Sequence, residues 1–256
     1  MPIELIDTHC HLSTLEHSPL EEILSRAAEA HVTRYVCIGA GSVKQSASDA
    51  IALAERYEHI WASVGVHPHD AGASTDVSDL EPLAAHSRVV AVGETGLDFF
   101  RDWAPKENQQ RLFENTIALA RNCKKPLIIH CRDAADDCLR TLVEQRAHEV
   151  GGVFHCYAQD AEFAKRLGDI NFLVSFPGSL TFKSANLLRE TAKAIPLEQI
   201  MLETDAPYMA PEPYRGKPSE PAHVLKVAEK LAEVKELTLE QIAEVTTKTA
   251  RTFFRI

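Results

Sequence analysis

Short apolar runs alternate with longer segments of helical periodicity along the whole chain. The runs are rich in β-branched residues, whereas the longer segments repeat apolar residues every three or four positions. This alternation is typical of βα units built around a parallel sheet. The predicted strands lie at 3–9, 34–38, 60–66, 88–92, 126–130, 151–155, 171–176 and 199–202.

Strands that alternate with helices in this number predict an α/β fold, the TIM-type (β/α)8 barrel. The length of 256 residues is usual for one domain of that fold, so we predict a single domain over 1–256. A doubly wound open sheet is the alternative, but the sequence lacks the G-x-G-x-x-G turn that usually follows its first strand.

Capping residues mark several helix boundaries. Ser18 precedes Pro19 in the pattern of a capping box with proline at the first helical position. Thr238 and Gln241 predict a second capping box near the end of the chain. Asp133 is a predicted N-cap for the helix after the fifth strand.

Composition is that of an ordinary globular protein, with 45% hydrophobic and 25% charged residues. No apolar tract is long enough to span a bilayer, and no basic segment followed by an apolar one opens the chain, so we predict a cytoplasmic protein that does not associate with membranes. The six cysteines include no C-x-x-C pair, which argues against zinc knuckles and structural disulfides.

The formal net charge of -10 argues against a protein that coats nucleic acid by bulk electrostatics, because nonspecific phosphate binding needs a basic face. It does not exclude a phosphate substrate. Metal ions and a few cations in a deep site can bind an anion against the overall charge.

Metal-ligand side chains gather where the predicted strands end. In the first strand, alternation turns Asp7, His9 and His11 to one face. A single histidine at a strand end is more often structural than a ligand, but the carboxyl ends of all barrel strands meet at the face that carries the active site. The candidates there are His9, His11, His67, Glu94, His130, His155, Glu203 and Asp205.

This set exceeds what one tetrahedral ion needs, so we predict two neighbouring metal ions bridged by a carboxylate and a hydroxide, with Glu94 as the candidate bridge. Two such ions activate water, which predicts hydrolysis. Asp205 is predicted to hold a metal and to take the proton of the attacking water. Glu203 is predicted to orient the metal ligands, to serve as an additional ligand or to relay protons. Asp7 is predicted to support the site without binding the metal. Residue type leaves Mg²⁺, Mn²⁺ and Zn²⁺ open.

Motifs spread along the chain carry a family resemblance. They are Asp7-Thr8-His9-Cys10-His11, Gly65-Val66-His67-Pro68, Gly93-Glu94-Thr95-Gly96-Leu97-Asp98, Ile129-His130-Cys131-Arg132, Phe154-His155-Cys156, Leu180-Thr181-Phe182-Lys183 and Glu203-Thr204-Asp205-Ala206-Pro207-Tyr208, with Arg215-Gly216-Lys217 beyond. The chain resembles the TatD family of metal-dependent deoxyribonucleases, within the amidohydrolase superfamily.

The resemblance implies a TIM barrel of the metal-dependent hydrolase type and a di-metal site. It also implies hydrolysis of phosphodiester bonds, typically by a 3′ to 5′ exonuclease on single-stranded DNA, with RNA as a further substrate. By motif position, the implied metal ligands are His9, His11, Glu94, His130, His155 and Asp205. Departures from the usual family pattern, such as Tyr157-Ala158-Gln159 after Cys156, touch no implied ligand but concern substrate preference.

Cations near the predicted strand ends suit a phosphate substrate, since Arg grips phosphate with two hydrogen bonds and Lys supplies a point charge. The predicted substrate-binding residues are His67, Arg132, Lys183 and Arg215, with Lys217 equally well explained as a surface cation. Trp103, Tyr157 and Tyr208 are candidates for base stacking or for core packing.

Two alternatives stay open at this point. The same activated water suits an amidohydrolase or lactonase that acts on a small amide or ester, although the cationic loops favour phosphate. A catalytically silent metal-binding partner protein is the second alternative, and the complete set of candidate ligands argues against it.

Overall fold

The computed structural model describes residues 3–41 and 44–256 and contains two compact units. Unit 1 consists of Met1–Cys37, Cys156–Arg166 and Leu173–Ile256, and unit 2 of Ile38–His155 and Leu167–Phe172. The single domain over 1–256 stays a prediction.

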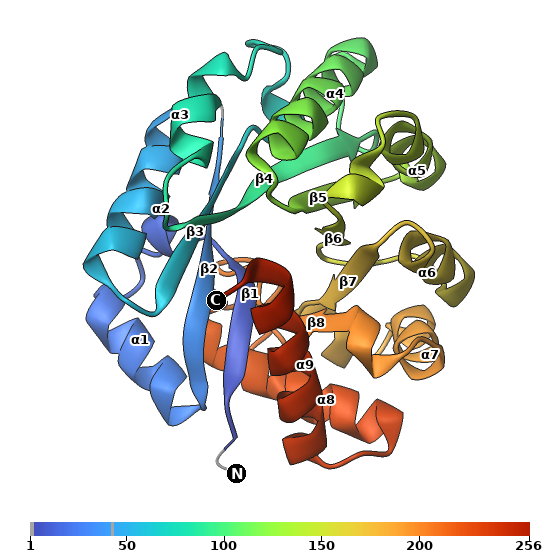
Figure 1. Ribbon diagram of the computed structural model, residues 1–256. Helices are drawn as coiled ribbons and strands as arrows, with labels where there is room; N and C mark the ends of the chain where they lie inside the picture. Colours follow the sequence, from blue (N-terminus) through green and yellow to red (C-terminus); the bar gives the residue numbers. More distant parts are fainter. Residues whose placement is uncertain (1–2, 42–43) are drawn as a thin grey trace. The chain divides into compact units, whose positions relative to one another are not determined.

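The strands of both units belong to one eight-stranded sheet whose order follows the sequence from β1 to β8. Neighbouring strands pair in parallel, and a helix follows most of them (Figure 1). This is the topology of the TIM-type (β/α)8 barrel, so the predicted fold class is confirmed. The strands are β1 (Leu5–Cys10), β2 (Val32–Ala40), β3 (Ile60–Gly65), β4 (Val89–Asp98), β5 (Leu127–Arg132), β6 (Gly152–Phe154), β7 (Phe172–Phe176) and β8 (Ile200–Leu202).

The helices bury one apolar face each, as the periodicity predicts. In α4, for example, Leu112, Phe113 and Ile117 are fully buried, at the spacing of one helical face. None of the helices in the described ranges is long and apolar enough to cross a membrane. They are α1 (Leu20–Glu29), α2 (Lys44–Arg56), α3 (Glu81–Ala84), α4 (Lys106–Cys123), α5 (Ala135–Glu144), α6 (Ala161–Gly168), α7 (Asn186–Ala194), α8 (Val224–Lys235) and α9 (Leu239–Phe254).

One predicted cap is present and two are not. The Thr238 hydroxyl accepts the Gln241 N–H at 3.2 Å, and the Gln241 side chain accepts the Thr238 N–H at 2.9 Å, which completes the predicted capping box. The Ser18 cap was wrong, because α1 begins one position later, with Pro19 as N-cap and no side-chain cap bond. The Asp133 cap was also wrong, because Asp133 has a left-handed φ of 51° and the residue after it precedes α5.

Two parts of the backbone matter most for the chemistry. In unit 1, the Asp205 N–H donates to the His9 carbonyl at 2.9 Å, and the His11 N–H donates to the Ala206 carbonyl at 2.8 Å. These bonds hold the segment after β8 beside the end of β1. In unit 2, β4 continues to Asp98, well past the predicted end at residue 92, and pairs with β5 along its whole second half.

Candidate metal sites

In unit 1, His9, His11 and Asp205 form a cluster at the carboxyl ends of β1 and β8. Their nearest ligand atoms all lie within 4.8 Å of one another. His9 Nε2 is 3.6 Å and His11 Nε2 is 3.4 Å from the same oxygen of Asp205, Oδ1. His9 is buried, whereas the Asp205 side chain keeps 14% of its surface exposed.

These separations are long for hydrogen bonds, whose N···O distances centre near ~2.9 Å. They match the spacing of ligands around a metal ion: donors about 2.0–2.1 Å from a tetrahedral centre lie roughly 3.3 Å apart. Two imidazoles and a carboxylate are a donor set that Zn²⁺ and Mn²⁺ accept. His9, His11 and Asp205 therefore fit a divalent metal ion.

Asp7 lies beside this cluster and is fully buried. The Thr204 hydroxyl donates to Asp7 Oδ2 at 2.6 Å, and the Thr204 N–H donates to Oδ1 at 3.0 Å. The His9 N–H also lies 3.3 Å from Oδ1. Burial raises the pKa of Asp7 to about 8, although the bonds from Thr204 and His9 oppose the shift. Asp7 thus joins β1 to the segment that carries Asp205.

Glu203 is also fully buried, and both of its carboxylate oxygens accept hydrogen bonds from neighbouring residues. Its Oε1 accepts the Cys156 N–H at 2.6 Å, and its Oε2 accepts the Ser175 hydroxyl. Cys156 has a left-handed φ of 46°, and the bond from its N–H helps to fix that backbone conformation. These contacts suit a residue that orients its neighbours.

In unit 2, Glu94 on β4 is surrounded by imidazoles. Its Oε1 lies 2.7 Å from His155 Nε2, 3.0 Å from His130 Nδ1 and 3.4 Å from His67 Nε2. Burial alone would raise the pKa of Glu94, but the charges and hydrogen bonds of these histidines hold it well below its usual range. A buried carboxylate among three histidines is a second set of donors that fits a divalent ion.

Asp98 and His69, to which the sequence analysis assigned no role, extend this second cluster. Asp98 Oδ2 accepts from His69 Nε2 at 2.7 Å and from His130 Nε2 at 3.0 Å. Burial would raise the pKa of Asp98. Hydrogen bonds donated by His130, by the Arg101 N–H and by His69 nevertheless hold this pKa well below its usual range.

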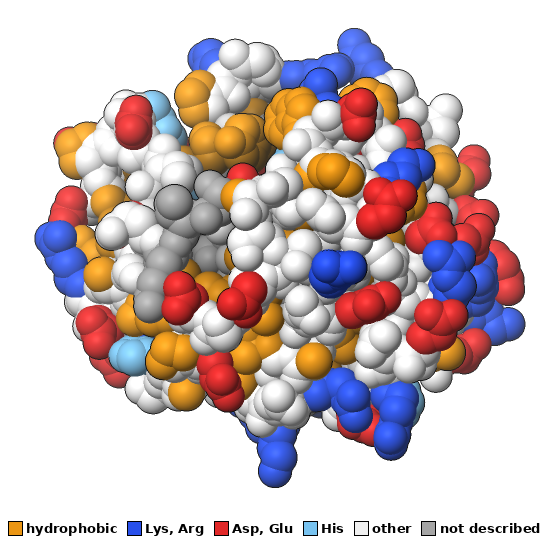
Figure 2. Space-filling view, turned by 90° about the horizontal axis from the view of Figure 1, so that it is seen from above, with side chains coloured by type: hydrophobic (Ala, Val, Ile, Leu, Met, Phe, Trp, Pro, Cys, Tyr) orange, Lys and Arg blue, Asp and Glu red, His pale blue; other side chains and the backbone are white. Residues whose placement is uncertain are grey.

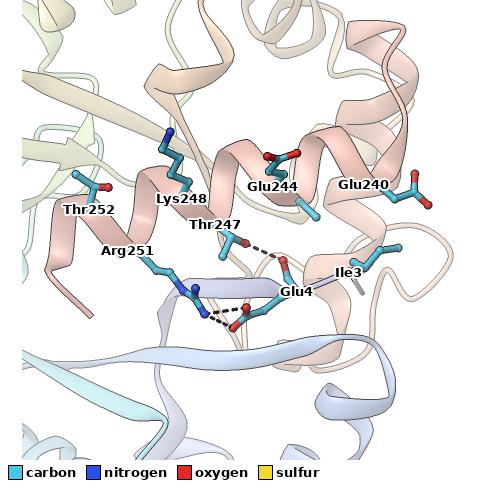
Figure 3. A pocket seen from close by; sticks show the side chains of 9 residues that line it. Ile3, Glu4, Glu240, Glu244, Thr247, Lys248, Arg251 and Thr252 are labelled. Carbon is cyan, nitrogen blue, oxygen red and sulfur yellow. Dashed lines mark hydrogen bonds and ion pairs between the residues drawn. The ribbon is translucent and has the colours of Figure 1, made fainter. Parts of the chain in front are cut away.

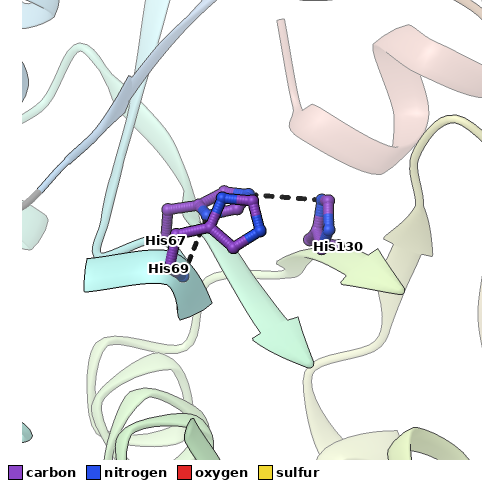
Figure 4. A group of neighbouring side chains, drawn as sticks. All are labelled: His67, His69 and His130. Carbon is purple, nitrogen blue, oxygen red and sulfur yellow. Dashed lines mark hydrogen bonds between the residues drawn. The ribbon is translucent and has the colours of Figure 1, made fainter. Parts of the chain in front are cut away.

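The rings of His67, His69 and His130 lie together (Figure 4), and their ligand atoms are within 4.8 Å of one another. Asp98 stands in a motif already quoted, four positions after Glu94, and His69 directly follows another, two positions after His67. The proximity of each residue to a candidate ligand in the sequence was the signal that could have revealed them.

The predicted cations Arg132, Lys183 and Arg215 are exposed and lie on separate segments of the chain. Arg132 covers the ring of Phe100 at 3.8 Å, and Arg215 covers Phe182 at 4.3 Å. Lys183 is exposed next to Phe182. Tyr157 is not available for stacking on bases, because it is buried and its hydroxyl donates to the Asp160 carbonyl at 2.7 Å; Trp103 and Tyr208 are exposed.

A pocket of about 310 Å³ in unit 1 lies between the start of β1 and α9 (Figure 3). Within it, Arg251 pairs with Glu4 at 2.8 Å, and the Thr247 hydroxyl donates to the Glu4 carbonyl at 2.7 Å. It lies at the amino end of β1, whereas barrel chemistry belongs to the carboxyl ends of the strands. We assign it no part in the chemistry.

A (β/α)8 fold with clusters of histidines and carboxylates at the carboxyl ends of its strands defines a metal-dependent hydrolase. The family model described as TatD-related DNase matches residues 6–255, and the chain belongs to this TatD family. The predicted family is thereby confirmed.

The relatives agree with that assignment. The metal-dependent hydrolase YabD of Bacillus subtilis is 43% identical, over 98% of this chain and 99% of its own length. The relative from Edwardsiella piscicida named 3'-5' ssDNA/RNA exonuclease TatD is 32% identical, over 92% of this chain and 93% of its own. The crystal structure of YjjV, a TatD homologue from Escherichia coli K12, superposes with a TM-score of 0.90 at 30% identity, over 98% of both chains.

Proposed function

We propose that this protein is a 3′ to 5′ exonuclease that hydrolyses phosphodiester bonds of single-stranded DNA, and of RNA, with two divalent metal ions. One ion is held by His9, His11 and Asp205 of unit 1. The other is held by Glu94, His130 and His155 of unit 2. The ions are Mg²⁺, Mn²⁺ or Zn²⁺, because imidazole suits Zn²⁺ while carboxylates and a phosphate substrate also accommodate the other two.

One observation carries the proposal: His9 Nε2 and His11 Nε2 both face Asp205 Oδ1, at 3.6 and 3.4 Å. That is the spacing of metal ligands rather than of hydrogen-bonded pairs. The choice of nucleic acid as substrate is supported by the relative from Edwardsiella piscicida, whose name states that activity.

Bound divalent ions supply Lewis acidity and lower the pKa of water, which favours attack on phosphorus. In our proposal, Asp205 takes the proton of the attacking water, because its carboxylate is partly exposed whereas the neighbouring carboxylates of Asp7 and Glu203 are fully buried. Glu203 acts on the reaction by orienting the Cys156 backbone, since it is fully buried. His67, Arg132, Lys183 and Arg215 bind phosphate groups of the strand, by charge and by paired hydrogen bonds.

Two other activities make different predictions. An amidohydrolase or lactonase would use the same ligands on a small amide or ester. A silent metal-binding partner protein would bind metal without turnover. The exposed Arg132 and Arg215 favour the phosphate substrate over both.

The test compares substrates on one preparation of the protein. A 5′-labelled single-stranded oligonucleotide should be shortened stepwise from its 3′ end, while amide and lactone panels should stay intact. Chelation should abolish the ladder, and add-back of Mg²⁺, Mn²⁺ or Zn²⁺ should identify the ion. Asp205→Asn should remove activity, whereas Asp169→Asn, an exposed carboxylate on unit 2, should leave it unchanged. Selective turnover of lactones or amides would overturn the nuclease assignment.

A further inference from the structure

The segment between β4 and α4 places two aromatic side chains in solvent. Phe100 is 52% exposed and Trp103 is 64% exposed, although side chains of this size normally bury most of their surface. The segment is held by Asp98, whose Oδ1 accepts the Phe100 and Arg101 N–H groups at 3.0 Å each. The two rings are therefore presented by an anchored backbone.

Two arginines stack on these rings. The Arg132 guanidinium lies 3.8 Å from the centre of the Phe100 ring, and Arg101 lies 5.2 Å from Phe100 and 5.3 Å from Trp103. Neither guanidinium has an ion-pair partner among the residues that the structure describes. A guanidinium that lies on a ring keeps its edge free to grip phosphate and adds its own flat surface to the stack.

The aromatic surface continues into the histidine cluster of unit 2. The Trp103 ring packs against His69 at 4.3 Å between centroids, and His69 is hydrogen-bonded to Asp98, which also holds His130. A nucleic-acid strand that stacks on Trp103 would therefore lie close to the candidate metal ligands of unit 2. The face drawn in Figure 2 shows no broad basic area, because basic and acidic side chains are interspersed on it.

We propose that Phe100 and Trp103, flanked by Arg101 and Arg132, form a stacking surface that binds the bases of a single strand and grips its phosphates next to the candidate metal site. This inference rests on the proposed nuclease function. It follows from charge as well as shape: in a chain of net charge -10, two unpaired cations stacked on exposed rings match a strand that offers both π faces and phosphates.

The test measures binding and not hydrolysis, so that it separates this inference from the nuclease proposal. A fluorescent, phosphorothioate-linked oligothymidylate is titrated with the purified full-length protein and followed by anisotropy. Trp103→Ala and Phe100→Ala should each weaken binding about 5- to 100-fold, which is the usual effect of one lost stacked base. Trp103→Phe should restore most of the affinity. Arg101→Gln and Arg132→Gln should each lower the slope of log affinity against log salt by about one.

Two comparisons make the result decisive. Val143→Ala removes an exposed apolar side chain elsewhere on unit 2 and should leave binding unchanged. An abasic strand of the same length keeps its charge but should bind to the wild type as weakly as the intact strand binds to Trp103→Ala. Equal binding of the abasic and intact strands, or unchanged affinity in Trp103→Ala and Phe100→Ala, would overturn the inference and leave the surface to a protein partner. Loss of hydrolysis with retained, Trp103-dependent binding would refute only the nuclease proposal.

Discussion

Asp98 Oδ2 accepts a hydrogen bond from His130 Nε2 at 3.0 Å, and this bond decides which ring nitrogen of His130 is available. In the neutral imidazole, an Nε2–H that donates to Asp98 leaves Nδ1 as the nitrogen that can bind a metal ion, and Nδ1 lies 3.0 Å from Glu94 Oε1. Burial alone would lower the pKa of His130, but the Asp98 and Glu94 carboxylates raise it. A carboxylate behind a histidine is the usual arrangement that orients a metal ligand.

We therefore expect Asp98→Asn to weaken metal binding at the ligands of unit 2 by about 10- to 100-fold, the usual cost of losing such a partner. The amide is a poorer acceptor than the carboxylate, so the ring of His130 loses its fixed tautomer. Titration of the apoprotein with Zn²⁺, followed by calorimetry, measures the effect. Asp102→Asn changes an exposed carboxylate in the same loop and should bind metal as the wild type does. Equal affinities for the two variants would show that Asp98 does not orient His130.

Gly96 allows β4 and β5 to approach at the level of His130. A Cβ at this position would lie 2.0 Å from the His130 carbonyl oxygen, and φ is 135°. We expect Gly96→Ala to lower the free energy of unfolding by about 2–5 kcal/mol, from overpacking and backbone strain together. At Gly216, φ is 89° but an added Cβ would have no atom within 4 Å. Backbone strain alone should therefore make Gly216→Ala cost about 1 kcal/mol. Urea unfolding measures both, and a Gly96→Ala protein as stable as Gly216→Ala would contradict the explanation.

The fold followed from the sequence because its main signals are local. Apolar runs such as 60–66 and 126–130 match β3 and β5 to within two residues, and the βα alternation leaves few topologies. The cluster of His9, His11 and Asp205 could be predicted from the sequence as well, because barrel topology alone gathers the carboxyl ends of the strands on one face.

What the sequence left out depends on contacts between distant elements. The role of Asp98 requires β4 to run six residues beyond its predicted end, which the glycines of Gly93-Glu94-Thr95-Gly96 concealed, since glycine normally marks the end of a strand. The stacking of Arg132 on Phe100 joins the end of β5 to the segment after β4, and no periodicity in the sequence indicates such a contact. The Ser18 cap failed because several residues in one stretch could begin the helix, and only the folded backbone selects one.

Thr204 provides a test of the support beneath the unit 1 cluster. Its buried hydroxyl donates to Asp7 Oδ2 at 2.6 Å and accepts the Ala206 N–H at 3.1 Å. Thr204→Val keeps the shape but leaves both buried groups short of a partner, so we expect a loss of about 1–3 kcal/mol in unfolding free energy, with weaker metal binding. Thr246→Val removes a buried hydroxyl that bonds only within α9 and should cost less than Thr204→Val, without any effect on metal binding. Thermal unfolding and Zn²⁺ titration measure the two effects, and equal losses in both variants would argue against a role for the Thr204–Asp7 pair.

The pair of Arg26 and Glu220 makes a prediction about pH. Arg26 Nε and Nη2 donate to the Glu220 carboxylate at 2.6–3.1 Å. The Glu220 side chain also accepts a hydrogen bond from the His223 N–H in the turn before α8. Burial alone would raise the pKa of Glu220, but the hydrogen bonds and charge of Arg26 lower it below the ordinary 4.5. A lowered pKa in the folded state means that the stabilisation is complete above about pH 4.5 and is lost as the pH falls through the folded value.

Glu220→Gln should therefore lower the unfolding free energy at pH 7 by about 1–2 kcal/mol, a value reduced for solvent screening because Arg26 is 39% exposed. The difference from the wild type should shrink as the pH falls from 4.5 toward 3, where the wild-type carboxyl becomes protonated as well. Urea unfolding at pH 7, 5, 4 and 3 follows this convergence. Glu190→Gln, an exposed residue on α7, should track the wild type at every pH. In an Arg26→Gln background, the Glu220→Gln change should cost markedly less at pH 7; an undiminished cost there would mean that the stabilisation comes from the turn and not from the ion pair.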